Sequence, residues 1–135
     1  MLRESSDSVI VRQPVPRETV LEIVQRYGEG LVRNPGVRDA WLFGSYARGD
    51  HKVGSDIDLC VVVYGKPSKK LYLALISGFY EISTEAEVQL HLYSARDFDT
   101  MLSEGIHFVR EIVSQGIQLV RSGELVFSSN QMNTH

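Results

Sequence analysis

One stretch decides the fold, residues 44–59, which reads GSYARGDHKVGSDIDL. It begins with a Gly-Ser pair and ends with two aspartates, Asp56 and Asp58, that one residue separates. Apolar runs lie directly before it, at 40–43, and after it, at 59–63. This pattern is typical of two buried strands joined by a polar loop. The pattern therefore predicts a Gly-Ser turn at the end of one strand and an acid pair at the start of the next strand.

The acid pair has a spacing that favours a cation. Residues i and i+2 of a strand point to the same face, about 6.6 Å apart along the chain, so Asp56 and Asp58 are expected side by side. At an effective dielectric constant near 20, their charges repel by roughly 2–3 kcal/mol. A metal ion relieves that repulsion, and two carboxylates with substrate phosphates form the oxygen set that Mg²⁺ prefers. The structural alternative is a solvated turn, because Asp-x-Asp is common in loops.

The Gly-Ser pair adds a second half to the site. Gly44 lets the backbone adopt positive φ and approach a ligand closely. Ser45 offers a hydroxyl and, if a helix begins there, backbone N–H groups that bind phosphate oxygens. Arg48 adds a positive charge nearby. Alone the pair would be an ordinary tight turn, but a strand, a phosphate-type turn and a metal-type acid pair form a far more specific combination.

The composition excludes several classes of function. The 135 residues carry a formal net charge of −3, which disfavours the broad basic surface of a nucleic-acid-binding domain. A single cysteine, Cys60, rules out an internal disulfide framework and fits a reducing cytoplasm. No run approaches the roughly 20 apolar residues of a membrane span, and the N-terminal residues lack the apolar core of a signal peptide. We expect a cytoplasmic protein that does not bind membranes.

Hydrophobic periodicity predicts one α/β domain. Helices are expected at 17–31, 69–80, from 95 onward and at 106–115, and strands at 37–43, 56–63, 87–93 and 117–120. Residues 1–15 are predicted to form a flexible N-terminal arm, 16–121 the folded domain, and 122–135 a disordered tail.

The central motif resembles a known signature. Residues 44–49 and 55–59 are similar to the motif of the DNA polymerase β-like nucleotidyltransferase superfamily, in particular its minimal nucleotidyltransferase (MNT) branch. The segment ending at 116–119 resembles the closing helix and strand of that branch, so the resemblance covers about residues 17–120. It implies an α/β (α+β) fold with a mixed β-sheet flanked by helices.

The resemblance also implies a site. Gly44, Ser45 and Arg48 would bind the triphosphate of an incoming nucleotide, with ATP expected from the family. Asp56 and Asp58 would be catalytic residues and ligands of two Mg²⁺ ions.

The third acid of the family has an ambiguous counterpart here. It usually lies on a neighbouring strand, and the polar face of 87–93 offers Glu87, Gln89 and His91. Glu87 is the only acid among them and is predicted as the third metal ligand and catalytic residue. If Gln89 occupies that position instead, the site lacks a base, and Glu87 is an ordinary acid at the entry of a strand. His91 is expected to be a hydrogen-bonded structural histidine.

The resemblance implies a function and leaves alternatives. Larger relatives carry an additional substrate-binding domain, for which 135 residues leave no room, so a partner protein is expected to present the acceptor. The implied function is transfer of AMP from ATP to a hydroxyl of that partner, as the antitoxin of a HEPN-type ribonuclease toxin. One alternative is a catalytically weak binding module that neutralises its partner by complex formation. Another is an aminoglycoside-type small-molecule transferase, in which a homo-oligomer would complete the pocket.

Overall fold

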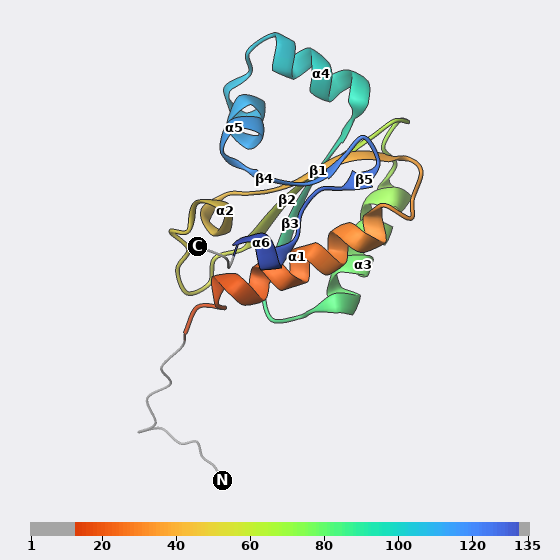
Figure 1. The fold of residues 1–135 in the computed structure, drawn as a ribbon. Coiled ribbons are helices and arrows are strands. Elements are labelled where there is room, and N and C mark those ends of the chain that lie inside the picture. Colours follow the sequence, from red (N-terminus) through yellow and green to blue (C-terminus); the bar gives the residue numbers. More distant parts are fainter. Residues whose placement is uncertain (1–12, 133–135) are drawn as a thin grey trace.

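The computed structural model describes residues 13–132, so most of the predicted N-terminal arm lies outside the described residues. The elements follow in the order α1 (Arg17–Leu31), β1 (Val37–Phe43), α2 (Ser45–Arg48), β2 (Ile57–Val63), α3 (Lys69–Ile82), β3 (Val88–Ser94), α4 (Ala95–Ser103), α5 (His107–Gln115), β4 (Ile117–Arg121), β5 (Glu124–Leu125) and α6 (Ser129–Met132). Figure 1 shows α4 and α5 on one side of the sheet and α1 and α3 on the other.

The sheet is mixed, as predicted. Its strand order is β3-β2-β1-β4-β5. β2 and β3 are parallel, whereas the other neighbours are antiparallel. A parallel pair needs a crossover connection, and α3 supplies it between β2 and β3. The central strands β1 and β2 carry the two halves of the predicted site at adjacent ends.

The larger core lies between the sheet and α1 with α3. Ile57, Leu59 and Val61 of β2 point into it and are at most 1% exposed. The Tyr27 hydroxyl of α1 donates a hydrogen bond to the Leu75 carbonyl of α3 at 2.8 Å, and its ring packs edge-on against Phe79. This face of the sheet is closed by apolar contacts.

A smaller core covers part of the opposite face. Its buried members come from the sheet and from α4 and α5: Trp41, Cys60, Val62, Phe98, Val109 and Ile112. Trp41 stacks on Phe98 with ring centroids 5.2 Å apart. Cys60 is fully buried in this core, and burial raises the pKa of its thiol to about 12.

Local signals in the sequence place the helix ends. The Ser68 hydroxyl accepts a hydrogen bond from the Leu71 N–H and caps α3, and the Ser94 hydroxyl accepts one from the Asp97 N–H and caps α4. Gly116 ends α5 where a side chain would collide with the Ile112 carbonyl. The helix therefore meets the sheet at a residue that has no Cβ.

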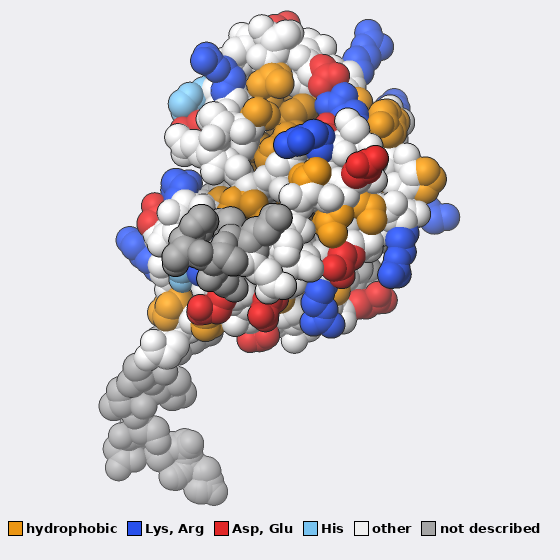
Figure 2. All heavy atoms as spheres, viewed as in Figure 1, with side chains coloured by type: hydrophobic (Ala, Val, Ile, Leu, Met, Phe, Trp, Pro, Cys, Tyr) orange, Lys and Arg blue, Asp and Glu red, His pale blue; other side chains and the backbone are white. Residues whose placement is uncertain are grey.

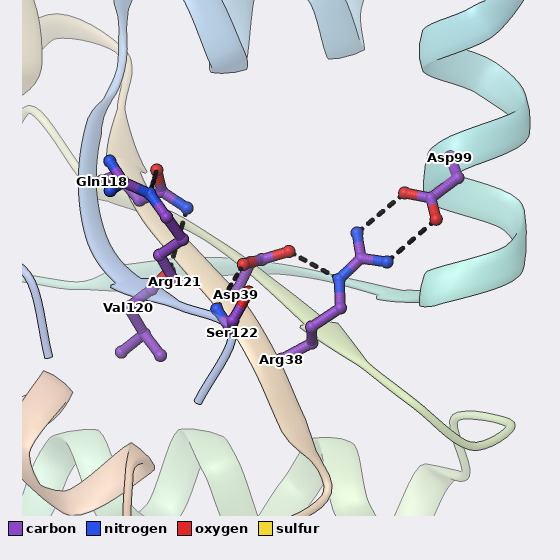
Figure 3. Close-up of polar contacts among 7 residues, drawn as sticks. All are labelled: Arg38, Asp39, Asp99, Gln118, Val120, Arg121 and Ser122. Carbon is purple, nitrogen blue, oxygen red and sulfur yellow. Dashed lines mark hydrogen bonds and ion pairs between the residues drawn. The ribbon is translucent and has the colours of Figure 1, made fainter. Parts of the chain in front are cut away.

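An ion-pair network holds α4 over the sheet. The Arg38 guanidinium of β1 donates to both carboxylate oxygens of Asp99 in α4, at 2.7 and 2.9 Å. Its Nε donates to Asp39, whose other oxygen accepts the Ser122 N–H. Figure 3 shows these contacts joining β1, α4 and the turn after β4. The network lies at the end of β1 remote from Gly44, so we assign it a structural role.

The C-terminal part of the chain differs from the prediction. Residues 122–132 were expected in a disordered tail, but they form β5, which pairs with β4, and α6. Phe127 is only 6% exposed, and the Ser129 N–H and hydroxyl both donate to the Gln25 side chain of α1. Strand pairing, the buried Phe127 ring and the hydrogen bonds of Ser129 together dock this segment on the domain. Among residues 13–132, no helix is long and apolar enough to cross a membrane.

Candidate active site

The Gly44 turn brings β1 against the acid pair. Gly44 has φ 77° and ψ −156°, a conformation that side chains rarely permit, and it directly precedes α2. A Cβ at Gly44 would collide with the Asp58 carboxylate. Position 44 therefore requires glycine for two reasons: its backbone conformation and the close approach of the Asp58 carboxylate.

Contacts from α1 hold α2 in place. Arg17 donates hydrogen bonds to the carbonyls of Tyr46 and Ala47, at 2.8 and 3.0 Å, at the C-terminal end of the short helix. The Tyr46 hydroxyl donates to the Val15 carbonyl, and the Tyr46 ring stacks on His51 at 4.3 Å. The Gly44 turn is thus fastened to the folded domain.

The register of the sheet places three side chains in a row. Phe43 of β1 pairs with Asp58 of β2, and Asp58 pairs with Gln89 of β3. Paired residues of neighbouring strands share a face, so these side chains lie side by side. The Gln89 amide also donates a hydrogen bond to the Asp56 carboxylate at 2.9 Å. The row carries the acid pair on the face covered by α4 and α5.

Asp58 is in an unfavourable setting for a bare carboxylate. Partial burial and, to a smaller extent, the charge of Asp56 raise the pKa of Asp58 to about 6, although the charge of Arg48 opposes the shift. Among residues 13–132, no side chain or N–H group donates a hydrogen bond to the Asp58 carboxylate. Uncompensated negative charge of this kind is what a bound cation would relieve.

Gln89, and not Glu87, lies opposite Asp58 in the sheet. The parallel register puts Gln89 opposite Asp58, and Glu87 lies before the strand, where its carbonyl accepts the Ile57 N–H. Its exposed side chain lines a surface hollow of about 410 Å³ together with Asp56. Within the described part of the chain, no three His, Cys, Asp or Glu residues are grouped as metal ligands. The strand register therefore favours Gln89 over Glu87 as the residue beside Asp58, and the metal-binding and catalytic roles of Glu87 stay predictions.

The remaining predicted residues lie around the turn. Ser45 is the first residue of α2, whose leading N–H groups have no partner within the helix. Arg48 ends α2, and its Nε donates to Asp50 at 3.1 Å. Arg48 also lines a shallow hollow with Gly44. The structure thus gathers Gly44, Ser45 and Arg48 at one end of the acid pair.

An aromatic cluster beside the acid pair was not predicted. Phe43, His91 and Phe108 have ring centroids 5.2–5.5 Å from one another. Burial lowers the pKa of His91, which favours a neutral imidazole among these rings. Phe108 lies off the Val109–Ile112 stripe that buries α5, and an aromatic residue outside the apolar stripe was the signal in the sequence.

Residues 28–131 match the protein family described as "Polymerase beta, Nucleotidyltransferase". The matched range contains the Gly44 turn, the acid pair and all five strands. A segment of 48 residues is 42% identical to part of a Methanocaldococcus jannaschii protein that is provisionally named a protein adenylyltransferase. That segment is 36% of this chain and 56% of the relative, so the match spans about half of the relative's length.

Two solved structures are similar in fold. One is a provisionally named nucleotidyltransferase from Sulfolobus solfataricus, with 19% identity and a TM-score of 0.55 over 83% of this chain and 90% of that one. The other is a chain of a toxin–antitoxin crystal structure with AMP-PNP, with 25% identity and a TM-score of 0.53 over 73% of each chain. These similarities confirm the predicted mixed-sheet fold.

Proposed function

The chain belongs to the polymerase beta nucleotidyltransferase family, and from that premise we propose a Mg²⁺-dependent enzyme that transfers AMP from ATP to a hydroxyl of a partner protein. The partner in this proposal is a HEPN-type ribonuclease toxin, which makes the chain an antitoxin. The relative provisionally named a protein adenylyltransferase supports the reaction, and the toxin–antitoxin structure with AMP-PNP supports the nucleotide and the setting.

The contact between Gly44 and Asp58 carries the proposal. It joins a turn suited to phosphate with an acid suited to a metal ion, and it leaves no room for a side chain at position 44. An ordinary tight turn has no need of a carboxylate packed against its glycine. An ordinary solvated acid pair would not require a glycine with positive φ at the end of the neighbouring strand.

The donor set fits a magnesium ion. Asp56 and Asp58 supply carboxylate oxygens at the start of β2, and a cation would relieve the burial and the Asp56 charge that raise the pKa of Asp58. When bound, Mg²⁺ would neutralise charge on the phosphates and on the transferred group. With Gln89 in place of a third acid, one ion held by the two aspartates suits the described residues better than two.

The remaining groups would act by positioning. Gly44 and Ser45 would hold phosphate oxygens, Arg48 would add positive charge, and Gln89 would fix the Asp56 carboxylate through its hydrogen bond. In the transfer, the acceptor oxygen forms a bond to the α-phosphorus while the bond from that phosphorus to the bridging oxygen breaks. Pyrophosphate leaves, and the acceptor proton passes to solvent. An amide at the third position cannot take that proton, so orientation of the reactants would provide most of the acceleration.

Gln89 also favours a second candidate function. A site that holds a nucleotide but lacks a third carboxylate could serve a binding module, which neutralises the toxin by forming a complex with it. This candidate uses the same fold and the same Gly44 turn. It differs from the first in predicting nucleotide binding with no covalent change in the partner.

The two candidates separate in one assay. The protein would be incubated with α-labelled ATP, Mg²⁺ and a HEPN-type protein as the proposed acceptor, in parallel with Asp56→Asn/Asp58→Asn. Glu104→Gln, an exposed acid after α4, is the matched control. We expect label on the partner with wild type and Glu104→Gln and none with the double variant. Tight association without label in any sample would contradict transfer and favour the binding module.

A further inference from the structure

The ring of Phe108 occupies the boundary between core and site. The sheet presents two rows on this face, Phe43–Asp58–Gln89 and, one step further under the helices, Trp41–Cys60–His91. Phe108 contacts Phe43 in the first row and His91 in the second, so it lies above the step between them. The part of the sheet that α5 covers ends at this ring, and the acid pair lies beside it.

Phe108 is an exposed apolar residue, in contrast to the two apolar residues that bury α5. It retains 40% of its accessible surface, whereas Val109 and Ile112 of the same helix are at most 1% exposed. Figure 2 shows hydrophobic side chains at the surface in the part of the view where Figure 1 draws α4 and α5. Two neighbouring rings hold Phe108 in place, while part of its surface is left without a partner in the described chain.

A small hollow, of about 30 Å³, lies between Phe108 and the turn. Phe43, Gly44, Arg48 and Phe108 line it, and the rest of its lining comes from the C-terminal half of α5 and the glycine after it: Glu111, Ile112, Gln115 and Gly116. A nucleobase is joined to its α-phosphate by a single ribose, so it must rest on a surface adjacent to the phosphate site. The other aromatic pair near the turn, Tyr46 and His51, is already stacked, and Tyr46 is 1% exposed.

From this arrangement we propose that Phe108, supported by Phe43 and His91, is the surface on which the base of the bound nucleotide stacks. This inference rests on the proposed function, and it adds the side chain that holds the base. Aromatic side chains bind nucleobases through their π-faces with little dependence on sequence, and the ring quadrupole gives offset or tilted contacts. Phe108 would therefore contribute to affinity for any nucleoside triphosphate and little to the choice of base.

The test compares a nucleotide with its phosphate part alone. Binding of ATP and of inorganic tripolyphosphate, each with Mg²⁺, would be measured by titration calorimetry on the full chain. We expect Phe108→Ala to raise the ATP dissociation constant about ten-fold or more. We expect the dissociation constant for tripolyphosphate to change less than about two-fold, because no base is present.

Three further variants complete the design. Phe108→Tyr keeps a ring and should restore ATP affinity to within about three-fold of wild type, whereas Phe108→Leu keeps bulk without a ring and should not. Val113→Ala is the matched control, since Val113 has the same 40% exposure on the same helix and is not among the residues that line the hollow. Phe108→Leu and Phe108→Tyr also decide the matter should the alanine variant fail to fold.

Each other outcome overturns the inference in a recognisable way. Equal losses for ATP and tripolyphosphate, or no loss for either, would show that Phe108 does not stack on a base. Unchanged ATP affinity with weaker transfer to the protein partner would assign the ring to acceptor docking. If wild type binds neither ATP nor tripolyphosphate, the proposed function fails, and this inference fails with it.

Discussion

Neighbouring residues of β2 point to opposite faces of the sheet, and helices cover the two faces to different extents. Ile57, Leu59 and Val61 face α1 and α3 and are almost completely buried. Asp58 and Cys60 face α4 and α5, but only Cys60 lies under their cover. A strand with buried residues on both faces can therefore still carry a binding site, provided that its first residues extend beyond the helices that cover the rest of it. On the closed face mutations should change stability, and on the open face they should change binding.

The largest expected effect is on the closed face. Leu59→Ala removes a side chain that is 1% exposed and leaves a cavity between the sheet and the helices. We expect the free energy of unfolding to fall by about 2–5 kcal/mol, measured by urea denaturation. Val113→Ala, at an exposed position, should change it by less than about 0.5 kcal/mol. A loss below 1 kcal/mol for Leu59→Ala would mean that this face is not the main core.

Two glycines with positive φ flank the loop that joins β1 to β2, and they differ in what surrounds them. Gly44 and Gly54 both have positive φ, but a Cβ at Gly54 would meet no atom within 4 Å, whereas one at Gly44 would collide with Asp58. We expect Gly54→Ala to lower stability by roughly 1–2 kcal/mol with Mg²⁺·ATP binding retained. Gly44→Ala should lower stability further and abolish that binding, as seen by calorimetry. Equal behaviour of the two variants would refute the role of the Gly44–Asp58 contact.

Asp58→Asn should raise the free energy of unfolding, whereas Leu59→Ala should lower it, although the two residues are adjacent. The pKa of Asp58 rises from its ordinary value of 3.8 to about 6 in the folded state, so the native protein binds more protons than the unfolded chain between these values. Wild type therefore loses stability as the pH rises through about 4 to 6, and the asparagine variant does not.

With metal removed by chelation, we expect Asp58→Asn to be more stable above pH 6, by on the order of 1–2 kcal/mol after allowance for solvent screening. The advantage should vanish below about pH 4. Urea midpoints across pH 4–8 would check this, with Asp97→Asn, an exposed acid in α4, as control. A variant less stable than wild type at pH 8 would show that the Asp58 charge is already compensated.

The smallest effect is expected at Glu87. Because Gln89 and not Glu87 lies opposite Asp58, Glu87→Gln should leave the transfer rate within about two-fold, less than 0.5 kcal/mol of barrier. Gln89→Glu should instead bind Mg²⁺ more tightly than wild type, since it adds a carboxylate beside the pair. Metal titrations and initial rates would separate the two positions, and a ten-fold loss in Glu87→Gln would restore Glu87 to the site.

Sequence reasoning was sufficient where the information is local. The β1 and β2 strands, the caps at Ser68 and Ser94, and the Gly44 turn all follow from residue type and spacing within a few positions. The position of Glu87 depends on how two strands 30 residues apart align, and a shift of two residues keeps the same side-chain parity. The docking of Phe127 and the exposure of Phe108 depend on which helices cover which part of the sheet, and periodicity cannot report that.

The most direct test of the central claim is the binding of ATP to the full chain with and without Mg²⁺. We predict that wild type binds ATP with Mg²⁺ at a stoichiometry of one, that chelation of the metal weakens binding at least ten-fold, and that Asp56→Asn/Asp58→Asn shows the weakened affinity even with Mg²⁺ present. Equal affinity in all of these conditions would contradict the assignment of Asp56, Asp58 and the Gly44 turn as a metal–triphosphate site.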